Sequence, residues 1–373
     1  MSRLAELRTA KFKKKSLFVR ALKDAARVRG WSIAEESSLD RMIRDWESGS
    51  RLSDTYVSLY CDVFGCTPME LGHFPADEVD EIEQDEALAL KRELFAATAT
   101  DVALVSLFEA QTENLRQMDR RLGAKALLPQ SRAHVEQMAN LLRHGVSHGA
   151  RQLTAGALTE AAALAGWQAL DLGQYREAWQ MHETAKGAAY ESDNPVILAH
   201  VTAQQAYVLL DLDQPREALE LIQHAHERAR AKLPALMRTW LYAAEAEAQA
   251  ATGNESASRR TFDAATDVLP NDPSDPEMPF LFLAGSHLTR WRGNCLARIG
   301  ADDAIEELYG AVEAMDPGFN RAEAGLRCDL AIALTARGEV EEARAQAEHA
   351  KQLAALTDSA RQRRRINQVL NAS

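Results

Sequence analysis

Cysteine, aromatic residues and strand-type patterns are all scarce in this sequence. Among its 373 residues there are 4 cysteines, 19 glycines and 11 prolines, and aromatic residues make up 6%. The cysteines lack the paired spacing of metal ligands, so we expect reduced core residues at Cys61, Cys66, Cys295 and Cys328. Because alternating runs rich in Val, Ile and Thr are missing, we expect an all-α protein with almost no sheet.

Membrane and catalytic signals are missing as well. No apolar run reaches about 18 residues, and the first residues are basic and amphipathic, unlike a secretory signal, so we expect a cytoplasmic protein without a membrane span. No Gly-rich phosphate loop, Gly-x-Ser-x-Gly elbow or His-Glu-x-x-His motif occurs. His144 and His148 have no acidic or thiol third ligand nearby, which favours surface histidines over a metal site. We expect no enzyme and no cofactor, and a hydrolase or metal enzyme is the weakest alternative.

What the sequence does contain is a helical-hairpin signature repeated between about residues 155 and 356. Asp171–Ala178 and Asp211–Ala218 share Asp, Leu, Gln, Arg, Glu and Ala at matching positions. Later copies place turn glycines at Gly253, Gly300 and Gly338. Small residues recur before and after each turn, which lets paired helices pack closely: Gly166, Ala206, Ala246, Gly293 and Ala331 before it, and Ala185, Ala225, Ala265, Ala311 and Ala350 after it.

This signature resembles the tetratricopeptide repeat. The resemblance implies a right-handed α-solenoid of stacked helix pairs with a concave inner surface that binds a partner. Aromatic, histidine and charged side chains at the concave positions suit a peptide or small-molecule effector. For each residue alone, packing between repeats is the alternative. The candidate effector-binding residues are Trp167, His200, Tyr207, Trp240, Glu247, His287, Arg290 and Asn294.

Charge is divided unevenly along the chain. Residues 1–30 carry a net charge of +8 and residues 1–75 a net charge of +3, which leaves −15 for the remainder of a chain with −12 overall. A basic head on an acidic body is typical of a head that contacts phosphates, because Lys and Arg displace the counterions of a polyanion. The alternative is that Lys11–Lys15 is only a solvated segment.

Short amphipathic segments fill the head. Apolar residues at helical spacing predict helices over residues 17–30, 39–46 and 56–64. Ser32 is suited to begin a helix and Gly49 to end one. Thr67 and Glu70 predict the capping box of a short final helix.

The runs Arg29–Ser32, Arg44–Arg51 and Phe64–Gly72 resemble the Cro/CI-type (XRE) helix-turn-helix domain. The chain is similar in particular to bacterial regulators in which this domain precedes tetratricopeptide repeats. The resemblance implies that Trp46 is buried, that Arg41 and Arg44 face DNA bases, and that residues beside them contact phosphates. The candidate DNA-binding residues are Lys13, Lys14, Lys15, Arg29, Ser38, Arg41, Arg44, Ser48 and Arg51.

Two features leave the DNA interface open. Between Ser32 and Trp46 the chain has about four residues fewer than the two-helix motif needs, so the scaffold helix is shortened or the motif no longer reads DNA. Asp40 and Asp45 adjoin the two arginines, so Arg41 and Arg44 form either a DNA-reading face or a salt-bridged surface.

The predicted organisation is a helix-turn-helix domain over residues 1–73, an acidic linker over 74–87 and a tetratricopeptide-like solenoid over 88–373. The acidic linker is a solvated spacer or a cover for the basic head. We expect a transcriptional regulator with double-stranded DNA and a peptide, small-molecule or protein effector as partners, and the resemblance implies a homodimer. The alternative is a non-DNA-binding adaptor whose helix-turn-helix head is degenerate.

Overall fold

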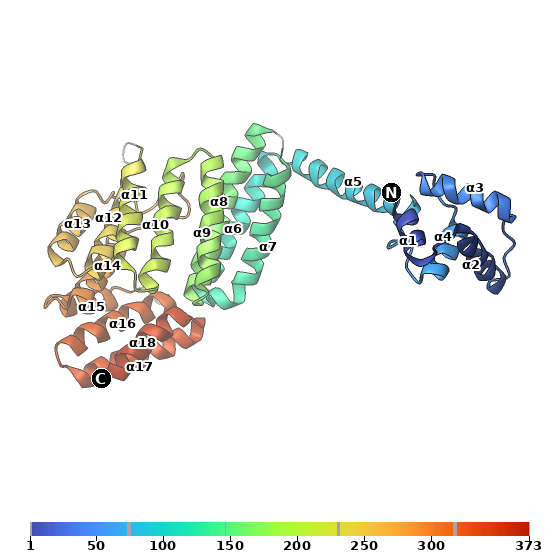
Figure 1. Cartoon of the computed structure of the whole chain (residues 1–373). Helices are drawn as coiled ribbons and strands as arrows, with labels where there is room; N and C mark the ends of the chain where they lie inside the picture. Colours follow the sequence, from blue (N-terminus) through green and yellow to red (C-terminus); the bar gives the residue numbers. More distant parts are fainter. Residues whose placement is uncertain (1, 73–75, 146, 230–231, 316–318, 373) are drawn as a thin grey trace. The chain divides into compact units, whose positions relative to one another are not determined.

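The protein is helical throughout the part of the chain that is described. The structure, a computed structural model, describes residues 2–72, 76–145, 147–229, 232–315 and 319–372. In these ranges the regular secondary structure is α-helix, apart from one isolated bridge between Ser274 and Phe282. The chain forms two compact units, which we call the head (Met1–Arg92) and the body (Glu93–Ser373); Figure 1 labels their helices. The predicted all-α class is confirmed.

The core of the head is built by helices α1 to α4. These helices span Arg3–Lys11, Lys15–Val28, Glu36–Glu47 and Asp54–Phe64. The predicted apolar stripes face inward, and six of their large side chains are fully buried: Phe18, Leu22, Leu39, Ile43, Leu59 and Tyr60. Each such side chain contributes about 1.5–3 kcal/mol relative to exposure. Trp46 is also buried, with its ring centroid 4.7 Å from that of Tyr56.

Only one helix lies between Ser32 and the end of α3. Residues 31–35 have no regular secondary structure and α3 begins at Glu36, so the prediction that Ser32 begins a helix was wrong. The backbone N–H of Ala34 donates to the Tyr56 hydroxyl oxygen at 3.3 Å. The short spacing leaves no room for a second helix and a turn. Residues 31–35 therefore connect α2 to α3 without a helix of their own.

The predicted stop signals of the head are present. Gly49 has φ 118° and Gly65, which follows α4, has φ 68°. The Thr67 N–H donates to a Glu70 carboxylate oxygen at 2.8 Å, and the Glu70 N–H donates to the Thr67 hydroxyl oxygen at 3.3 Å. The capping box thus forms, but residues 68–72 make a turn rather than the predicted helix.

Helix α5 (Ala76–Thr98) contains most of the acidic stretch predicted as a linker. The head and body divide within this helix, after Arg92. The side chains of residues 73–85 lie outside the described residues. No helix in the described ranges has the length and apolar character needed to cross a membrane.

The body begins with α6 (Val102–Leu122) and α7 (Ala124–His144), followed by five antiparallel helix pairs. The pairs are α8 (His148–Asp171) with α9 (Tyr175–Glu191), α10 (Pro195–Asp211) with α11 (Pro215–Ala229), α12 (Ala235–Ala251) with α13 (Glu255–Asp267), α14 (Gly285–Ile299) with α15 (Ala304–Glu313), and α16 (Asn320–Ala336) with α17 (Val340–Thr357). The five predicted turn positions share a left-handed backbone: Gly173, Asp213, Gly253, Gly300 and Gly338. The predicted tetratricopeptide-like repeat is confirmed in its register.

Small residues let the paired helices approach. A Cβ added to Gly166 would lie 3.0 Å from the His182 ring, and one added to Gly293 would lie 2.7 Å from a Leu308 methyl carbon. Ala206, which occupies the equivalent position in α10, is fully buried. The packing reason given for the recurring small residues is therefore confirmed.

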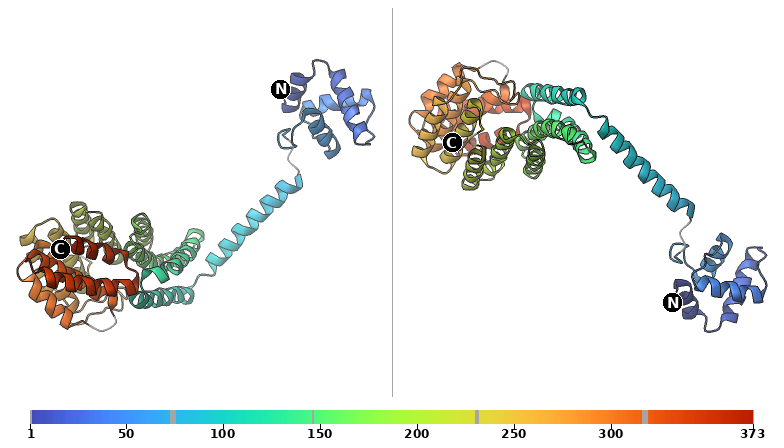
Figure 2. Two further views of the ribbon diagram at one scale, coloured as in Figure 1. Left: turned by 90° about the horizontal axis from the view of Figure 1, so that it is seen from below. Right: turned by 90° about the horizontal axis from the view of Figure 1, so that it is seen from above.

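The last helices return to the first helices of the body. Arg321 of α16 pairs with Asp119 of α6 and with Asp171 of α8, the latter at 3.4 Å. Arg361 of α18 (Ala360–Ala372) donates to Asp211 of α10 at 2.9 Å. We call these five residues the clasp. Figure 2 shows the C-terminal helices, in red, beside the teal helices at the start of the body. The clasp closes the concave surface.

Candidate functional site

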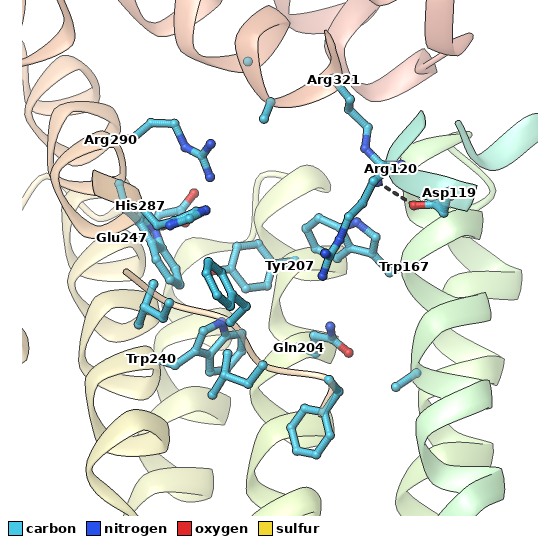
Figure 3. A pocket seen from close by; sticks show the side chains of 18 of the residues that line it. Asp119, Arg120, Trp167, Gln204, Tyr207, Trp240, Glu247, His287, Arg290 and Arg321 are labelled. Carbon is cyan, nitrogen blue, oxygen red and sulfur yellow. Dashed lines mark hydrogen bonds and ion pairs between the residues drawn. The ribbon is translucent and has the colours of Figure 1, made fainter. Parts of the chain in front are cut away.

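A cavity of about 450 Å³ lies on the concave side of the body. The inner helices α8, α10, α12 and α14 form one wall, and α6, α16, α18 and residues 280–283 close the other sides (Figure 3). All eight residues predicted to bind an effector line this cavity: Trp167, His200, Tyr207, Trp240, Glu247, His287, Arg290 and Asn294. The repeat register alone therefore predicted that residues up to 127 positions apart in sequence, Trp167 and Asn294, line one cavity.

Aromatic rings from successive repeats pack against one another along the wall. The ring centroids of Trp167 and Tyr207 are 5.8 Å apart, and those of Trp240 and Trp291 are 6.1 Å apart. Trp167 and Trp240 are only partly buried. These rings thus make the inter-repeat contacts that were the alternative interpretation, and they also border the cavity.

The Pro-rich loop between the third and fourth pairs enters the concave surface. Phe280 stacks on His200 with ring centroids 4.7 Å apart. Met278, Leu281 and Leu283 are buried in the same core as the inner helices. Burial lowers the pKa of His200 to about 3, so its ring is neutral at physiological pH. The sequence gave no periodic signal for Phe280, because its segment is irregular.

Arginines are concentrated in the lining. Seven arginines and four acidic residues border the cavity, although the chain beyond residue 75 carries −15. Five of the seven form ion pairs with carboxylates: Arg116 with Glu160, Arg298 with Glu247, Arg321 with Asp119, Arg361 with Asp211 and Arg365 with Asp329. These five guanidinium groups are largely committed to structure.

Arg290 and Arg120 differ from those five. No hydrogen bond or ion pair joins either guanidinium to another described residue. Burial lowers the pKa of Arg290, and Asp329 partly opposes that effect. The Asp329 carboxylate is itself bonded to Asn294, at 2.8 Å, and to Arg365. In Figure 3 the Arg290 side chain points into the open space of the cavity.

Two of the predicted residues also hold the lining together. Glu247 accepts hydrogen bonds from the Trp291 ring N–H at 2.8 Å and from Arg298 at 3.2 Å. Asn294 donates to Asp329. On another side of the cavity, the side-chain oxygen of Gln204 is buried without a donor in the described part of the chain. A ligand donor can satisfy that oxygen.

The predicted DNA-binding residues lie on the surface of the head. Lys13 and Lys14 are exposed at the turn before α2, Lys15 begins α2, and Arg41, Arg44, Ser48 and Arg51 are exposed on or just after α3. Ser38 is half-buried. Arg29 is held by Asp62 at 2.7 Å and lies over the Trp31 ring. The hydrogen bond from Arg29 lowers the pKa of Asp62.

The exposed side of α3 carries charges of both signs. Arg44 lies 3.7 Å from the Asp40 carboxylate, and its side chain is 63% exposed. Glu36 and Asp45 are exposed on the same helix. Arg41 has no hydrogen bond or ion pair to a described residue. The salt-bridged alternative therefore describes Arg44 and not Arg41.

The position of α3 also depends on a residue pair, Arg8 and Glu47, that the sequence did not predict. Arg8 of α1 makes a two-armed contact with Glu47 of α3, with one arm at 3.2 Å. Both side chains are 13% exposed. This pair raises the pKa of Arg8 and ties the end of α3 to α1. No local pattern predicts a contact across 39 positions.

Comparison with solved structures finds proteins of similar fold. No protein-family model and no curated protein matches this chain. The crystal structure of a Rap protein complexed with Competence and Sporulation Factor is similar to it at 15% sequence identity and a TM-score of 0.44, over 99% of this chain and 97% of that chain. The tetratricopeptide-like fold of the body rests on the five helix pairs described above.

Proposed function

We propose that this chain is a DNA-binding transcriptional regulator whose tetratricopeptide-like body binds an effector. The observation that carries this proposal is the cavity of the body, which unites all eight predicted effector residues. A regulator that responds to an effector needs a ligand site of this kind in its body.

The clasp is a set of contacts that an effector bound in the cavity would strengthen or weaken. Arg321 and Arg361 line the cavity and also join α16 and α18 to α6, α8 and α10. A ligand that contacts both sides of the cavity binds the closed body more tightly than an open one, and so shifts that equilibrium. In a homodimer, such a shift would change the placement of two heads on paired half-sites.

The head supports DNA binding through its exposed cations. Arg41, Arg44 and Arg51 are exposed on or just after α3, while Trp46 between them is buried. Phosphate contacts from the basic first residues would set the register, and the α3 arginines would face base edges. The Arg8–Glu47 pair holds the end of α3 against α1.

The adaptor alternative draws on two observations. Residues 31–35, which precede α3, have no regular secondary structure. Acidic side chains share the exposed side of α3. A head of this kind that lacks DNA affinity would leave a helical scaffold for protein contacts.

Selection from a random duplex pool by the full chain tests the proposal. We expect enrichment of a sequence motif by the wild type, and its loss when Arg41, Arg44 and Arg51 are changed together to Ala. A matched control changes three exposed arginines on outer helices of the body: Arg176, Arg216 and Arg344. Retained enrichment in the control supports the assignment to the head. No enrichment by the wild type overturns the DNA role and favours the adaptor.

A further inference from the structure

Arg290, a half-buried cation of the cavity lining without an ion pair to a described residue, points to the chemistry of the effector. We infer that the cavity binds a small organic anion with a planar aromatic part, and that its acidic group pairs with Arg290. This inference rests on the proposed role of the cavity as the effector site. It narrows the peptide, small-molecule and protein effectors expected from the sequence to one class.

The unpaired cations of the lining favour an anion. Five of the seven lining arginines are paired with carboxylates, including Asp211 beside the lining, so Arg290 and Arg120 are left without an ion pair to a described residue. His200 is neutral because burial lowers its pKa to about 3. A guanidinium withdrawn from water is stabilised only by an anion or by full hydrogen bonding. Arg290 makes no hydrogen bond or ion pair to a described residue, and the attraction of Asp329 offsets its burial only in part.

The paired arginines do not compete for the ligand's acid group. Arg365 is held by Asp329, and Arg298 by Glu247 and Asn294. Arg120 is unpaired too, but its side chain is exposed, so bulk water solvates it. Arg290 is the lining arginine for which binding an anion relieves the most desolvation.

The rest of the lining suits a flat apolar group. Six of its 31 residues are Phe, Tyr or Trp, although aromatic residues make up only 6% of the chain. Figure 3 shows Tyr207 and Trp240 bordering the space into which Arg290 points. Aromatic rings favour stacked or edge-on contacts with another ring.

The size of the cavity favours a small molecule over a protein. A volume of about 450 Å³ falls in the range of roughly 300–1,000 Å³ that holds one drug-sized ligand. A stable protein partner instead buries about 800 Å² on each side of an open surface. The clasp and residues 280–283 close the concave surface that such a partner would use.

Two dyes that differ only in charge test the inference on the full chain. Anilinonaphthalene sulfonate carries an acidic group, and N-phenyl-1-naphthylamine is the same ring system without it. We expect the wild type to bind the sulfonate about tenfold or more tightly than the neutral dye, as a charge-assisted contact implies. Trp167, Trp240 and Trp291 line the cavity, so quenching of tryptophan fluorescence reports occupancy.

Substitutions at Arg290 locate the acid group. Arg290→Gln should remove the preference for the sulfonate and leave the affinity for the neutral dye within about twofold. Arg290→Lys keeps the charge and should keep part of the preference. The control is Arg292→Gln on the same helix, where Arg292 pairs with Asp263 at 3.2 Å and with Glu307 at 3.4 Å away from the cavity. That variant should bind both dyes like the wild type, and thermal unfolding checks that each variant folds.

Three outcomes overturn the inference. Equal affinity of the wild type for both dyes contradicts the anionic class while leaving the cavity as the effector site. A sulfonate preference that survives in Arg290→Gln, or that is lost in Arg290→Lys, contradicts the role of Arg290. If neither dye binds, the cavity is not a ligand site. Duplex selection measures DNA binding by the head separately, so that failure is distinguishable.

Discussion

The head and the body place their arginines in opposite environments. In the head, Arg41, Arg44 and Arg51 are exposed to solvent. In the body, Arg321 and Arg361 have side chains only 17% and 12% exposed, and each is paired with carboxylates from helices far away in sequence. Arginine side chains are thus accessible to an external polyanion in the head, whereas in the body they join helices to one another. The contrast shows that net charge alone does not identify a nucleic-acid-binding surface. The exposure of each arginine and its pairing with carboxylates determine whether it can bind a phosphate.

The largest effect is expected where the clasp is broken. Arg361→Ala leaves Asp211, whose side chain is 10% exposed, without its guanidinium partner. Removing one partner of a buried pair costs about 3–5 kcal/mol. Urea unfolding of the full chain measures this loss as a lower free energy of unfolding of the body.

Arg363→Ala is the matched control for the clasp. Arg363 lies on the same helix, is 44% exposed and pairs with Asp358. An exposed pair contributes about 0–1 kcal/mol, so this variant should unfold almost like the wild type. Equal losses in the two variants would show that the clasp is no more than surface pairing.

The head should respond less to loss of its own interhelical pair. Arg8→Ala removes the contact with Glu47 that joins α1 to α3. A hydrogen bond to a charged group contributes about 1.5–3 kcal/mol. Unfolding followed by the fluorescence of Trp46, with Arg3→Ala as an exposed control, measures the change. A loss as large as that of Arg361→Ala would remove the contrast between the units.

Acid should weaken the body through its buried histidines. Burial lowers the pKa of His182 to about 4, with a smaller contribution from Lys186, so the folded state binds fewer protons than the unfolded state below about pH 6.5. Stability therefore falls as pH falls from about 6.5 towards 4, by about 1.4 kcal/mol per pH unit for this residue.

A substitution isolates the contribution of His182. In His182→Leu the pH dependence of the unfolding free energy should become shallower by that amount, whereas His224→Leu at an exposed position should leave it unchanged. Denaturant titrations at about pH 7 and pH 5 measure both slopes. An unaltered slope in His182→Leu would mean that its ring is protonated in the folded body.

The smallest effect on folding is expected at the α3 surface. Arg44 and Asp40 form an i, i+4 pair in which both side chains are at least 46% exposed. Such pairs contribute about 0.3–0.5 kcal/mol. A double-mutant cycle with Arg44→Ala and Asp40→Ala measures the coupling. A value well above 1 kcal/mol would make Arg44 a structural residue, like the arginines of the body.

The sequence predicted those parts of the structure that local physics determines. Each helix pair has the same tight turn and the same close helix contact. Left-handed turn positions such as Gly253 and Gly300, and small residues such as Gly293, therefore recur. That register also brought the effector candidates to one cavity. The buried stripe around Trp46 follows from helical spacing in the same way.

Long-range closure left no such local pattern. Asp171 and Asp211 were visible as repeated acids, but their partners Arg321 and Arg361 lie 150 positions further along the chain. Phe280 enters the cavity from an irregular loop that has no period to analyse. Residues 31–35 have no regular secondary structure where a helix was predicted to begin, and the short spacing before Trp46 did not indicate which element would be missing.

The salt dependence of DNA affinity tests the central claim, that the head binds a polyanion, most directly. The dissociation constant of the full chain for a random duplex is measured between about 50 and 200 mM salt. We predict a linear loss of log affinity with log salt, with a slope that falls by about 0.9 for each phosphate-contacting cation removed, as in a head triple variant with Lys13, Lys14 and Lys15 changed to Ala. The Arg176, Arg216 and Arg344 triple variant should keep the wild-type slope. A flat dependence in the wild type, or a slope that the head triple variant leaves unchanged, would contradict the account.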